Sequence, residues 1–481
     1  MDQTRPGIAS RPASWIEIFR GRLGVYTLLL NFGILFFGID GFLVNTMMPT
    51  IVADIGGVAY YAWATMLFVV GAIVGSAGYG PLRARLGGRK SLALGGLVFT
   101  LAALGCSIAP HMGALLVARL FQGLGGGVIV AGAMAFVSAL YEPRLRTRAI
   151  AFTSLTWIGC AVIGPLEGGI FAELGWWRGA FWLYVPMGAA FLAGVWWKIP
   201  ESSDRSTAES RALRFPIWRL ALLAAGVMCV GSAGRVDGEA LRLALIAAAG
   251  LIVWYAFARD AAARNRLFPS RPLSLSSLVG LGYWVHIMIT AAYTAVSIFL
   301  PLVLAVIFEI RPLYVGVVGG MMSIGWSVSS ALVAGLHGGR ERISMAVGPF
   351  LMLIGCAGLA ASASSGGSLA GVAVLAVLIG LGIGCIHVHI TAKVMAAAEA
   401  GEESITASSL STIRSLGMAF GSAIAGTIAN VAGLEAVVTF EAVSLAATGV
   451  YLFTLVPLAF AAAAALRFIR LSARPAAQLA E

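Results

Sequence analysis

Long apolar segments alternate with short polar connections along the whole chain. A helix needs about 20 consecutive apolar residues to cross the hydrocarbon core of a bilayer. The 481 residues contain 14 segments of roughly this length. They cover approximately residues 25–49, 58–80, 91–110, 112–139, 149–171, 177–197, 217–234, 241–257, 277–306, 313–335, 344–363, 369–391, 405–431 and 442–466. The pattern predicts an all-α polytopic membrane protein with 14 transmembrane helices.

The amino-acid composition agrees with this prediction. Hydrophobic residues make up 59% of the chain and charged residues only 11%, whereas soluble domains carry about 25% charged residues. The net charge of +11 is explained by basic loops that face anionic lipid headgroups. We therefore expect membrane lipids as neighbours and no nucleic-acid partner.

Basic residues are distributed unevenly over the connections. With 14 spans, 26 of the 32 Lys and Arg residues lie on the side that holds both termini, and four lie on the other side. The remaining two, Arg119 and Arg414, lie inside spans. By the positive-inside rule both termini are cytoplasmic, in a multi-pass protein of the cell (inner) membrane. Residues 1–24 show no cleavable signal pattern, so we expect the first span to remain as an anchor.

The longest polar stretches, 198–216 and 257–276, bracket the seventh and eighth spans. This placement predicts two six-helix bundles with two helices inserted between them. Two six-helix halves are typical of transporters that alternate access around a midplane site. The expected parts are a cytoplasmic tail (1–24), an N-terminal bundle (25–198), cytoplasmic loops with the inserted helices (199–276), a C-terminal bundle (277–466) and a second cytoplasmic tail (467–481). We expect a monomer.

Three charged residues fall inside apolar segments of the N-terminal bundle: Asp40, Arg119 and Glu167. A charge in hydrocarbon costs at least about 2.5–3.5 kcal/mol, so it persists only beside a partner or a watery cavity. At a rise of about 1.5 Å per residue, Asp40 and Arg119 lie at the same depth within a turn. Such a pair suits proton coupling, because the acid stays ionised beside the guanidinium and takes a proton when the two separate. A structural salt bridge without a transport role is the alternative.

Glu167 follows Pro165, which is expected to bend its helix. Neighbouring glycines leave room for a ligand, so Glu167 is a second candidate for protonation or a contact for a cationic substrate. A helix-packing hydrogen bond is the alternative. Arg414 is the only basic residue inside a span of the C-terminal bundle. It would lock one conformation if it met Glu167, although the two lie about 10 Å apart along the membrane normal at the helical rise.

The histidines and cysteines, and the motifs searched for, indicate no catalytic site, metal site or cofactor site. His286 lies at the depth of Arg414 and either faces a cavity or packs against a helix, while His387 and His389 are expected near the cytoplasmic interface. These last two are two residues apart on one helix and so point in different directions. The five cysteines fall in spans without CxxC spacing, as packing residues do. We find no zinc or iron constellation, P-loop or nucleophile–base set.

Four motifs occur in order in the first half: IDGFLVNTMMPTIVADIG (39–56), GPLRARLGGRK (80–90), ARLFQGLGGG (118–127) and GCAVIGPLEGG (159–169). Together they resemble signatures of the major facilitator superfamily, specifically its fourteen-spanner drug:proton antiporter branch. Asp40, Asn45 and Pro49 match in the first motif, and Arg119 and Gln122 match in the third. In the second half, STIRSLGMAFG (411–421) resembles the thirteenth helix of the branch. The resemblance covers nearly the whole chain.

The resemblance implies the major facilitator fold and transport driven by a proton gradient, without a cofactor. It implies an antiporter motif on the fifth helix (Gly159, Gly164, Pro165, Gly168, Gly169) and a cytoplasmic gate (Gly80, Arg83, Arg85, Gly87, Arg89). Candidates for the substrate path are Asn45, Gln122, His286 and Arg414. Two positions depart from the branch. Ala84 stands where the gate motif usually carries Asp, and Glu167 replaces a usually apolar residue, as in relatives that export lipid-like molecules.

These observations favour a proton-coupled secondary active transporter that exports hydrophobic or amphipathic compounds, either drugs or lipid-like molecules, by alternating access. Protons would move through Asp40, Arg119 and Glu167. The alternatives are an importer or uniporter of a small organic solute, or a transport-inactive membrane scaffold or sensor. The antiporter motif argues against import, and the lack of a soluble module in the sequence argues against a scaffold.

Overall fold

The structure is a computed structural model that describes residues 14–201, 217–263, 265–434 and 438–473. Parts of both expected tails (1–13 and 474–481) and of the loop before the seventh span (202–216) lie outside the described residues. The described chain is helical and contains no β-strand. Its α-helices are α1 (Gly21–Ile55), α2 (Trp63–Leu86), α3 (Gly88–Ser107), α4 (Met112–Leu140), α5 (Pro143–Glu173), α6 (Trp177–Lys198), α8 (Ile217–Ala233), α9 (Glu239–Ala261), α10 (Leu278–Val306), α11 (Pro312–Val333), α12 (Gly339–Ser365), α13 (Leu369–Ala396), α14 (Glu403–Ala429) and α15 (Phe440–Ser472).

Thirteen of the described helices are long and apolar enough to cross a membrane, and α8 is a shorter apolar helix. With 17 residues, α8 spans about 26 Å at the helical rise, slightly less than a hydrocarbon core of about 30 Å. The predicted all-α membrane fold is therefore confirmed. Some helices, such as α1, α5 and α15, run beyond both ends of the apolar segments on which they were predicted.

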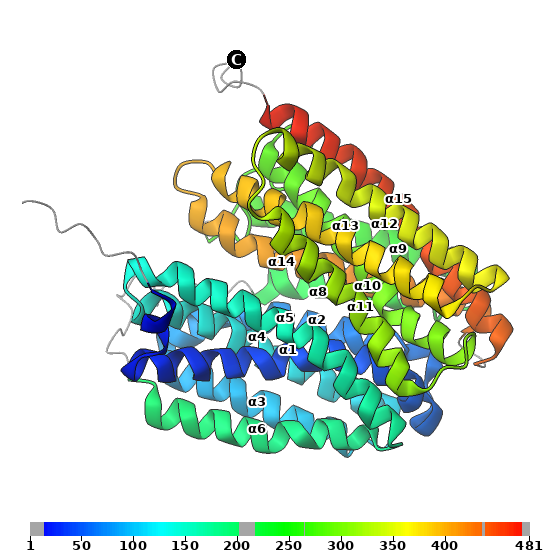
Figure 1. Cartoon of the computed structure of the whole chain (residues 1–481), viewed down its shortest axis with the longest axis horizontal. Coiled ribbons are helices and arrows are strands. Elements are labelled where there is room, and N and C mark those ends of the chain that lie inside the picture. The colour runs from blue at the N-terminus through cyan, green and yellow to red at the C-terminus, as the bar shows by residue number, and fades with distance from the viewer. Residues whose placement is uncertain (1–13, 202–216, 264, 435–437, 474–481) are drawn as a thin grey trace, which may run out of the picture.

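The two halves of the chain repeat one packing scheme. In the first half α1 packs on α5, α2 on α4 and α3 on α6. In the second half the equivalent helices pair in the same way, with α10 on α14, α11 on α13 and α12 on α15. Figure 1 shows α1–α6 in the lower part of the view and α10–α15 in the upper part. The six-plus-six repeat that is weak in sequence is thus plain in the packing.

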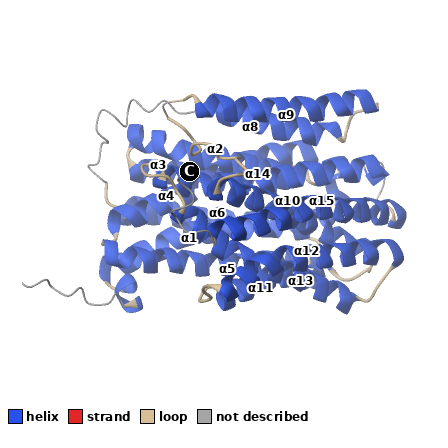
Figure 2. Ribbon diagram, turned by 90° about the horizontal axis from the view of Figure 1, so that it is seen from above, coloured by secondary structure: helices blue, strands red, loops and turns tan. Residues whose placement is uncertain are grey.

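Helices α8 and α9 stand beside this pair of bundles. They pack on each other, and α8 also packs on α14 and α2, so the inserted pair lies along one edge of the molecule (Figure 2). A buried ion pair between Arg219 and Asp260 joins α8 to α9. Asp260 also accepts backbone N–H bonds at 3.0 Å from Leu267 and Phe268, which fold the following loop back onto α9. A buried charge needs such multiple partners to be tolerated.

The loop after α9 is tied to the second half by Glu402. Its carboxylate accepts a hydrogen bond at 2.8 Å from the backbone N–H of Ser270 and pairs with Arg266 at 2.9 Å. Burial alone would raise the pKa of Glu402, but the Ser270 hydrogen bonds and the Arg266 guanidinium outweigh burial and lower this pKa. The carboxylate is therefore ionised at neutral pH, and it fixes the connection between the inserted pair and α10.

Glycines allow the closest helix contacts in both halves. A Cβ atom on Gly71 or Gly123 would collide with a backbone carbonyl oxygen of the facing helix, so α2 and α4 touch through their backbones. Gly380 and Gly384 give α13 the same contact with α11. Within lipid, such close van der Waals approach replaces the hydrophobic force that packs helices in water.

Polar contacts between the two halves gather at one end of the molecule. Glu173 pairs with Arg311, and Asn45 donates to Ser297 at 3.2 Å. Ser422 donates to the Ala62 carbonyl at 2.8 Å. We call this the contact end, and we call the other end, where α1 begins and α15 finishes, the basic end. In Figure 1 the ribbons of the two halves meet toward the right and diverge toward the left.

The α2–α4 contact gives a first prediction. Gly123→Ala places a methyl group against the Phe68 carbonyl oxygen, and overpacking of this kind costs about 1–3 kcal/mol. The apparent Tm in detergent should therefore fall. Gly250→Ala on α9, where a Cβ has open space, is the matched control and should hold or raise the Tm through better helix propensity. A Tm loss of the same size in both variants would contradict the backbone contact.

Candidate functional site

The two opposite charges predicted at one depth meet inside the first half. Arg119 Nη1 donates to Asp40 Oδ2 at 2.5 Å and to Gln122 Oε1 at 2.7 Å. Gln122 Nε2 donates to Asp40 Oδ1 at 3.0 Å and closes the network. The charged side chains are at most 1% exposed. The proximity of Asp40 and Arg119 is confirmed as a direct contact, while a role in proton movement stays a prediction.

The local sequence explains why this network forms. Arg119 and Gln122 are three residues apart on α4 and so share one helix face, which meets the middle of α1 at Asp40. Phe68 of α2 covers the guanidinium. Arg119 Cζ lies 4.1 Å from the centroid of the Phe68 ring, which is an attractive cation–π arrangement. Cys106 Sγ donates to Gln122 Oε1 at 3.5 Å. Buried charges are stable only when paired and hydrogen-bonded, so the network depends on all its members.

Glu167 lies on α5, two residues after Pro165, and is half-buried. Its Oε1 atom is buried, and the buried hydroxyl of Tyr184 lies beside this carboxyl group. Asp40 and Tyr184 interact with Glu167 electrostatically. The first half therefore holds two carboxyl groups in one region of the membrane. Asp40 is paired with a guanidinium, and within the described chain Glu167 has no cation beside it.

The glycines of the antiporter motif bring α5 close to two other helices. A Cβ atom on Gly164 or Gly168 would stand 2.7 Å from a backbone carbonyl oxygen of α1. A Cβ atom on Gly169 would stand 3.0 Å from a backbone carbonyl oxygen of α11, in the other half. Gly159, like Gly80 of the gate motif, faces open space. The motif thus couples the helix that carries Glu167 both to the helix of Asp40 and to the second half.

The predicted gate motif lies where α2 ends and α3 begins. Gly87 adopts a φ of 83°, in the left-handed region that favours glycine, and turns the chain between the two helices. Arg83 and Arg85 occupy the last turn of α2, where cations suit the helix dipole. Arg89 donates to Glu201 Oε2 at 3.0 Å within the same half. Among the described residues no hydrogen bond or ion pair links this motif to the second half.

A second polar cluster joins four helices of the second half. Arg414 Nη1 on α14 lies 3.4 Å from His387 Nε2 on α13. The His387 ring lies 5.3 Å from the ring of His286 on α10 and 5.5 Å from the ring of Trp326 on α11. His286 Nε2 in turn contacts the Thr391 hydroxyl at 3.0 Å. Sequence reasoning named Arg414 and His286 separately and missed their connection through His387.

Two expectations for these residues need correction. His387 does not lie at the interface, because α13 continues to Ala396 and places His387 nine residues, about 14 Å, inside the helix. His389 points elsewhere, toward Glu341 at 3.7 Å, as its spacing predicted. The direct pair of Glu167 with Arg414 does not form among the described contacts, and Arg414 instead contacts a histidine of its own half.

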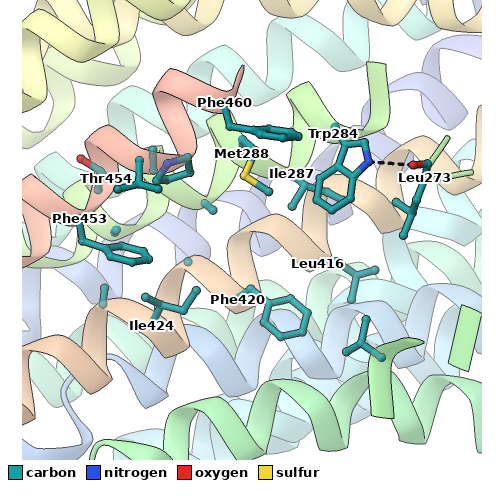
Figure 3. Close-up of a pocket in the computed structure, with 18 of the residues that line it drawn as sticks. Leu273, Trp284, Ile287, Met288, Leu416, Phe420, Ile424, Phe453, Thr454 and Phe460 are labelled. Carbon is teal, nitrogen blue, oxygen red and sulfur yellow. Dashed lines mark hydrogen bonds between the residues drawn. The ribbon is translucent and has the colours of Figure 1, made fainter. Parts of the chain in front are cut away.

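A pocket of about 630 Å³ opens between α9, α10, α14 and α15 (Figure 3). Its walls are apolar and include Trp284, Met288, Phe420, Phe453 and Phe460. The Trp284 indole N–H is satisfied by the Leu273 carbonyl at 3.0 Å. On α10 the lining residues lie on the face opposite His286, so the pocket is separate from the polar cluster. Sequence reasoning could not find it, because it lies between two pairs of helices, α9–α10 and α14–α15, that are distant in the chain.

The family model described as Major Facilitator Superfamily matches residues 30–422. The chain belongs to this superfamily. It is 29% identical over 439 residues to the probable multidrug-efflux transporter Rv1634 of Mycobacterium tuberculosis, covering 88% of this chain and 91% of that protein. It is 25% identical over 435 residues to the multidrug transporter protein MdtP of Bacillus subtilis, covering 85% and 76%. The partially occluded inward-open xylose transporter XylE of E. coli shares the fold, with a TM-score of 0.58, 14% identity and coverage of 91% and 98%.

Membership of a transporter superfamily confirms the fold class and the family resemblance read from the motifs. It also fits the site chemistry. The described residues hold no group of three or more His, Cys, Asp or Glu side chains able to bind a metal ion. Two polar clusters of the transporter lie inside the bundles, one around Asp40 and Arg119 in the first half and one around Arg414 and His387 in the second.

The buried ion pair gives a second prediction. Arg119→Ala leaves Asp40 as an uncompensated buried charge and should cost about 3–5 kcal/mol of stability. The matched control is Arg178→Ala, which breaks a more exposed ion pair with Asp54 and should cost about 1 kcal/mol or less. Thermal unfolding in detergent compares the two variants. Adding Asp40→Asn to Arg119→Ala should recover much of the loss, and equal Tm values for the two arginine variants would refute the dependence.

Proposed function

We propose that this protein is a proton-coupled secondary active transporter that exports hydrophobic or amphipathic compounds by alternating access. The observation that supports it most is the Asp40–Arg119 pair, fully buried between α1 and α4 in a chain of the Major Facilitator Superfamily. Such a pair has a charge state that changes when its geometry changes. It therefore gives the transporter a means to couple a proton to the movement of its helices.

The distribution of basic residues supports an orientation with the basic end in the cytoplasm. The polar contacts between the halves lie at the contact end, with Glu173–Arg311 and Asn45–Ser297 among them. In this orientation the contact end is extracytoplasmic, and the conformation is inward-facing. These contacts have to break when the transporter opens outward, while new contacts form at the basic end.

Proton uptake would follow from the separation of α1 and α4. In this conformation Asp40 accepts hydrogen bonds from Arg119 and Gln122, and these donors favour its carboxylate form. A shift of α4 that withdraws these donors leaves a bare carboxylate in a low-dielectric interior, where binding a proton removes the charge. Glu167 is near enough to interact with Asp40 and offers a second carboxyl for the proton on its way across the membrane.

The side chains that line the pocket available to a substrate are almost all apolar. The pocket between α9, α10, α14 and α15 has a volume of about 630 Å³, within the range of about 300–1,000 Å³ common for small-molecule sites. Its lining offers almost no groups for recognising a sugar or an amino acid. The similarity to Rv1634, a probable multidrug-efflux transporter, and to the multidrug transporter protein MdtP supports the same substrate class and the outward direction.

The proposal predicts proton flux that depends on substrate. Purified protein in vesicles that contain a pH dye should move protons when lipophilic cations or neutral lipid-like compounds are added. Asp40→Asn should abolish this flux, because the amide keeps the shape of the side chain and accepts from only one of the two donors, Arg119 and Gln122, and has no titratable charge. The Tm of the variant serves as the folding control. Flux equal to that of the wild type would exclude Asp40 from the coupling.

A fourth prediction concerns Glu167. Glu167→Gln should change the pH dependence of export or the preference for substrate charge, because it removes the unpaired carboxyl beside Asp40. Export measured over a pH series with one cationic and one neutral substrate tests both effects. Glu142→Gln, at the exposed start of the same helix, provides a carboxyl-to-amide control. Wild-type profiles in both series would remove Glu167 from the mechanism.

A further inference from the structure

We propose that Arg414, with His387 and Trp326 beside it, forms a binding site for the anionic group of an amphipathic substrate. This inference rests on the proposed transport function and narrows its substrate class. Four considerations support it: the balance of charge around Arg414, the hydrogen-bonding state of His387, the direction in which the cluster faces, and the apolar surface beside it.

The two arginines inside the membrane have opposite surroundings. Arg119 is balanced by Asp40 and is 1% exposed. Arg414 has no carboxylate within ion-pair distance among the described residues, and its contact is a neutral type of side chain, His387 at 3.4 Å. A cation held away from water without a counter-charge is strongly disfavoured. The transporter keeps one here, half-buried, which is the arrangement expected where a ligand supplies the missing negative charge.

Some N–H groups of Arg414 and His387 have no described acceptor and are free to bind that ligand. Because a guanidinium only donates, Nε2 of His387 must accept from Arg414, and the neutral ring then carries its proton on Nδ1. No described residue takes this Nδ1 proton. The remaining N–H groups of Arg414, unlike Nε of Arg119, are not among the buried atoms without partners, so they reach accessible space. Arg414 and His387 thus keep N–H donors without a described protein acceptor, as carboxylate, sulfate or phosphate groups require.

The cluster faces the region between the halves. His286 and Ser297 are eleven residues apart on α10, which is about three full turns, so they lie on one face of this helix. Ser297 accepts a hydrogen bond from Asn45 of α1 across the interface of the halves. The face of α10 that carries His286 is therefore the face turned toward the first half. The apolar pocket of Figure 3 lies behind it, on the opposite face.

Aromatic rings lie next to these donors, and for this reason we expect the ligand to carry an apolar part as well as a negative charge. Trp326 packs edge-on against His387, with ring centroids 5.5 Å apart, and Tyr293 packs on Trp326 at 5.2 Å. The Tyr293 hydroxyl is satisfied by Ser323 at 3.2 Å, and the Tyr293 ring is buried against Trp326. An anion with a hydrocarbon tail would place its charge on Arg414 and its tail on these rings.

Binding of radiolabelled octanoate to the purified transporter in neutral phosphatidylcholine nanodiscs tests the site, with empty nanodiscs subtracted. The wild type should bind octanoate, and unlabelled octyl sulfonate should compete. Arg414→Gln should weaken binding by about 10- to 100-fold, as expected for loss of a charged hydrogen bond, and Arg414→Lys should retain much of it. Arg342→Gln, at an exposed position, removes the same charge elsewhere and should bind as the wild type does.

Competition experiments identify the ligand class. Octanol and octyltrimethylammonium share the tail but lack the negative charge and should compete weakly, and acetate shares the charge but lacks the tail and should also compete weakly. Equal competition by octanol, or unchanged binding in a folded Arg414→Gln variant, would overturn the anion site. Equal competition by acetate would overturn its amphipathic character, and absence of octanoate binding to the wild type would overturn the proposal as a whole.

This test does not depend on transport. If Arg414-dependent binding is found but vesicles show no substrate-dependent proton flux, the binding site stands and the exporter proposal fails. If flux is present with lipophilic cations and octanoate does not bind, the exporter stands and the anion site fails. Size-exclusion profiles and Tm values of Arg414→Gln and Arg414→Lys separate loss of binding from loss of the fold.

Discussion

A carboxylate and a guanidinium that share a water-free interior have to stay together, and this requirement organises the first half of the transporter. Asp40 and Arg119 are each almost fully enclosed, so each is the main compensation for the other. Gln122 completes the hydrogen bonds, and Phe68 covers the cation. The pair thereby holds α1 against α4, and any movement that separates these helices has to change the charge of the acid or supply a substitute.

The second half repeats the helix packing of the first but not its electrostatics. The same three helix pairings recur, and glycines bring α13 to α11 as they bring α4 to α2. Where the first half neutralises its arginine with a carboxylate, the second surrounds Arg414 with histidine and aromatic rings. In the proposals above, the two bundles of one architecture have different purposes, proton coupling in the first half and ligand recognition in the second, and α5 packs on α11 between them.

Several features of the site were predictable from sequence because they follow from position along a helix. The depth of Asp40 matched that of Arg119 through the helical rise alone, and the contact of α5 with its neighbours followed from its glycines. Other features were not predictable. His387 was assigned to the interface because the apolar segment was taken to finish near residue 391, whereas the helix continues to Ala396. The proposed meeting of Glu167 with Arg414 depends on how the halves are tilted, which no local pattern contains.

The sequence by itself determined the membrane-spanning helices, the family, and the charged residues that a bilayer tolerates only with a function or a partner. These follow from local properties of the sequence: the length of an apolar segment, the free-energy cost of a charge in hydrocarbon, and the spacing of residues in a motif. Tertiary structure alone decided which partner each charge has, that the halves touch at the contact end, and that a pocket opens beside the inserted pair. Such features join residues from helices distant in the chain, and helices in lipid associate through detailed shape and hydrogen bonding that apolar pattern does not encode.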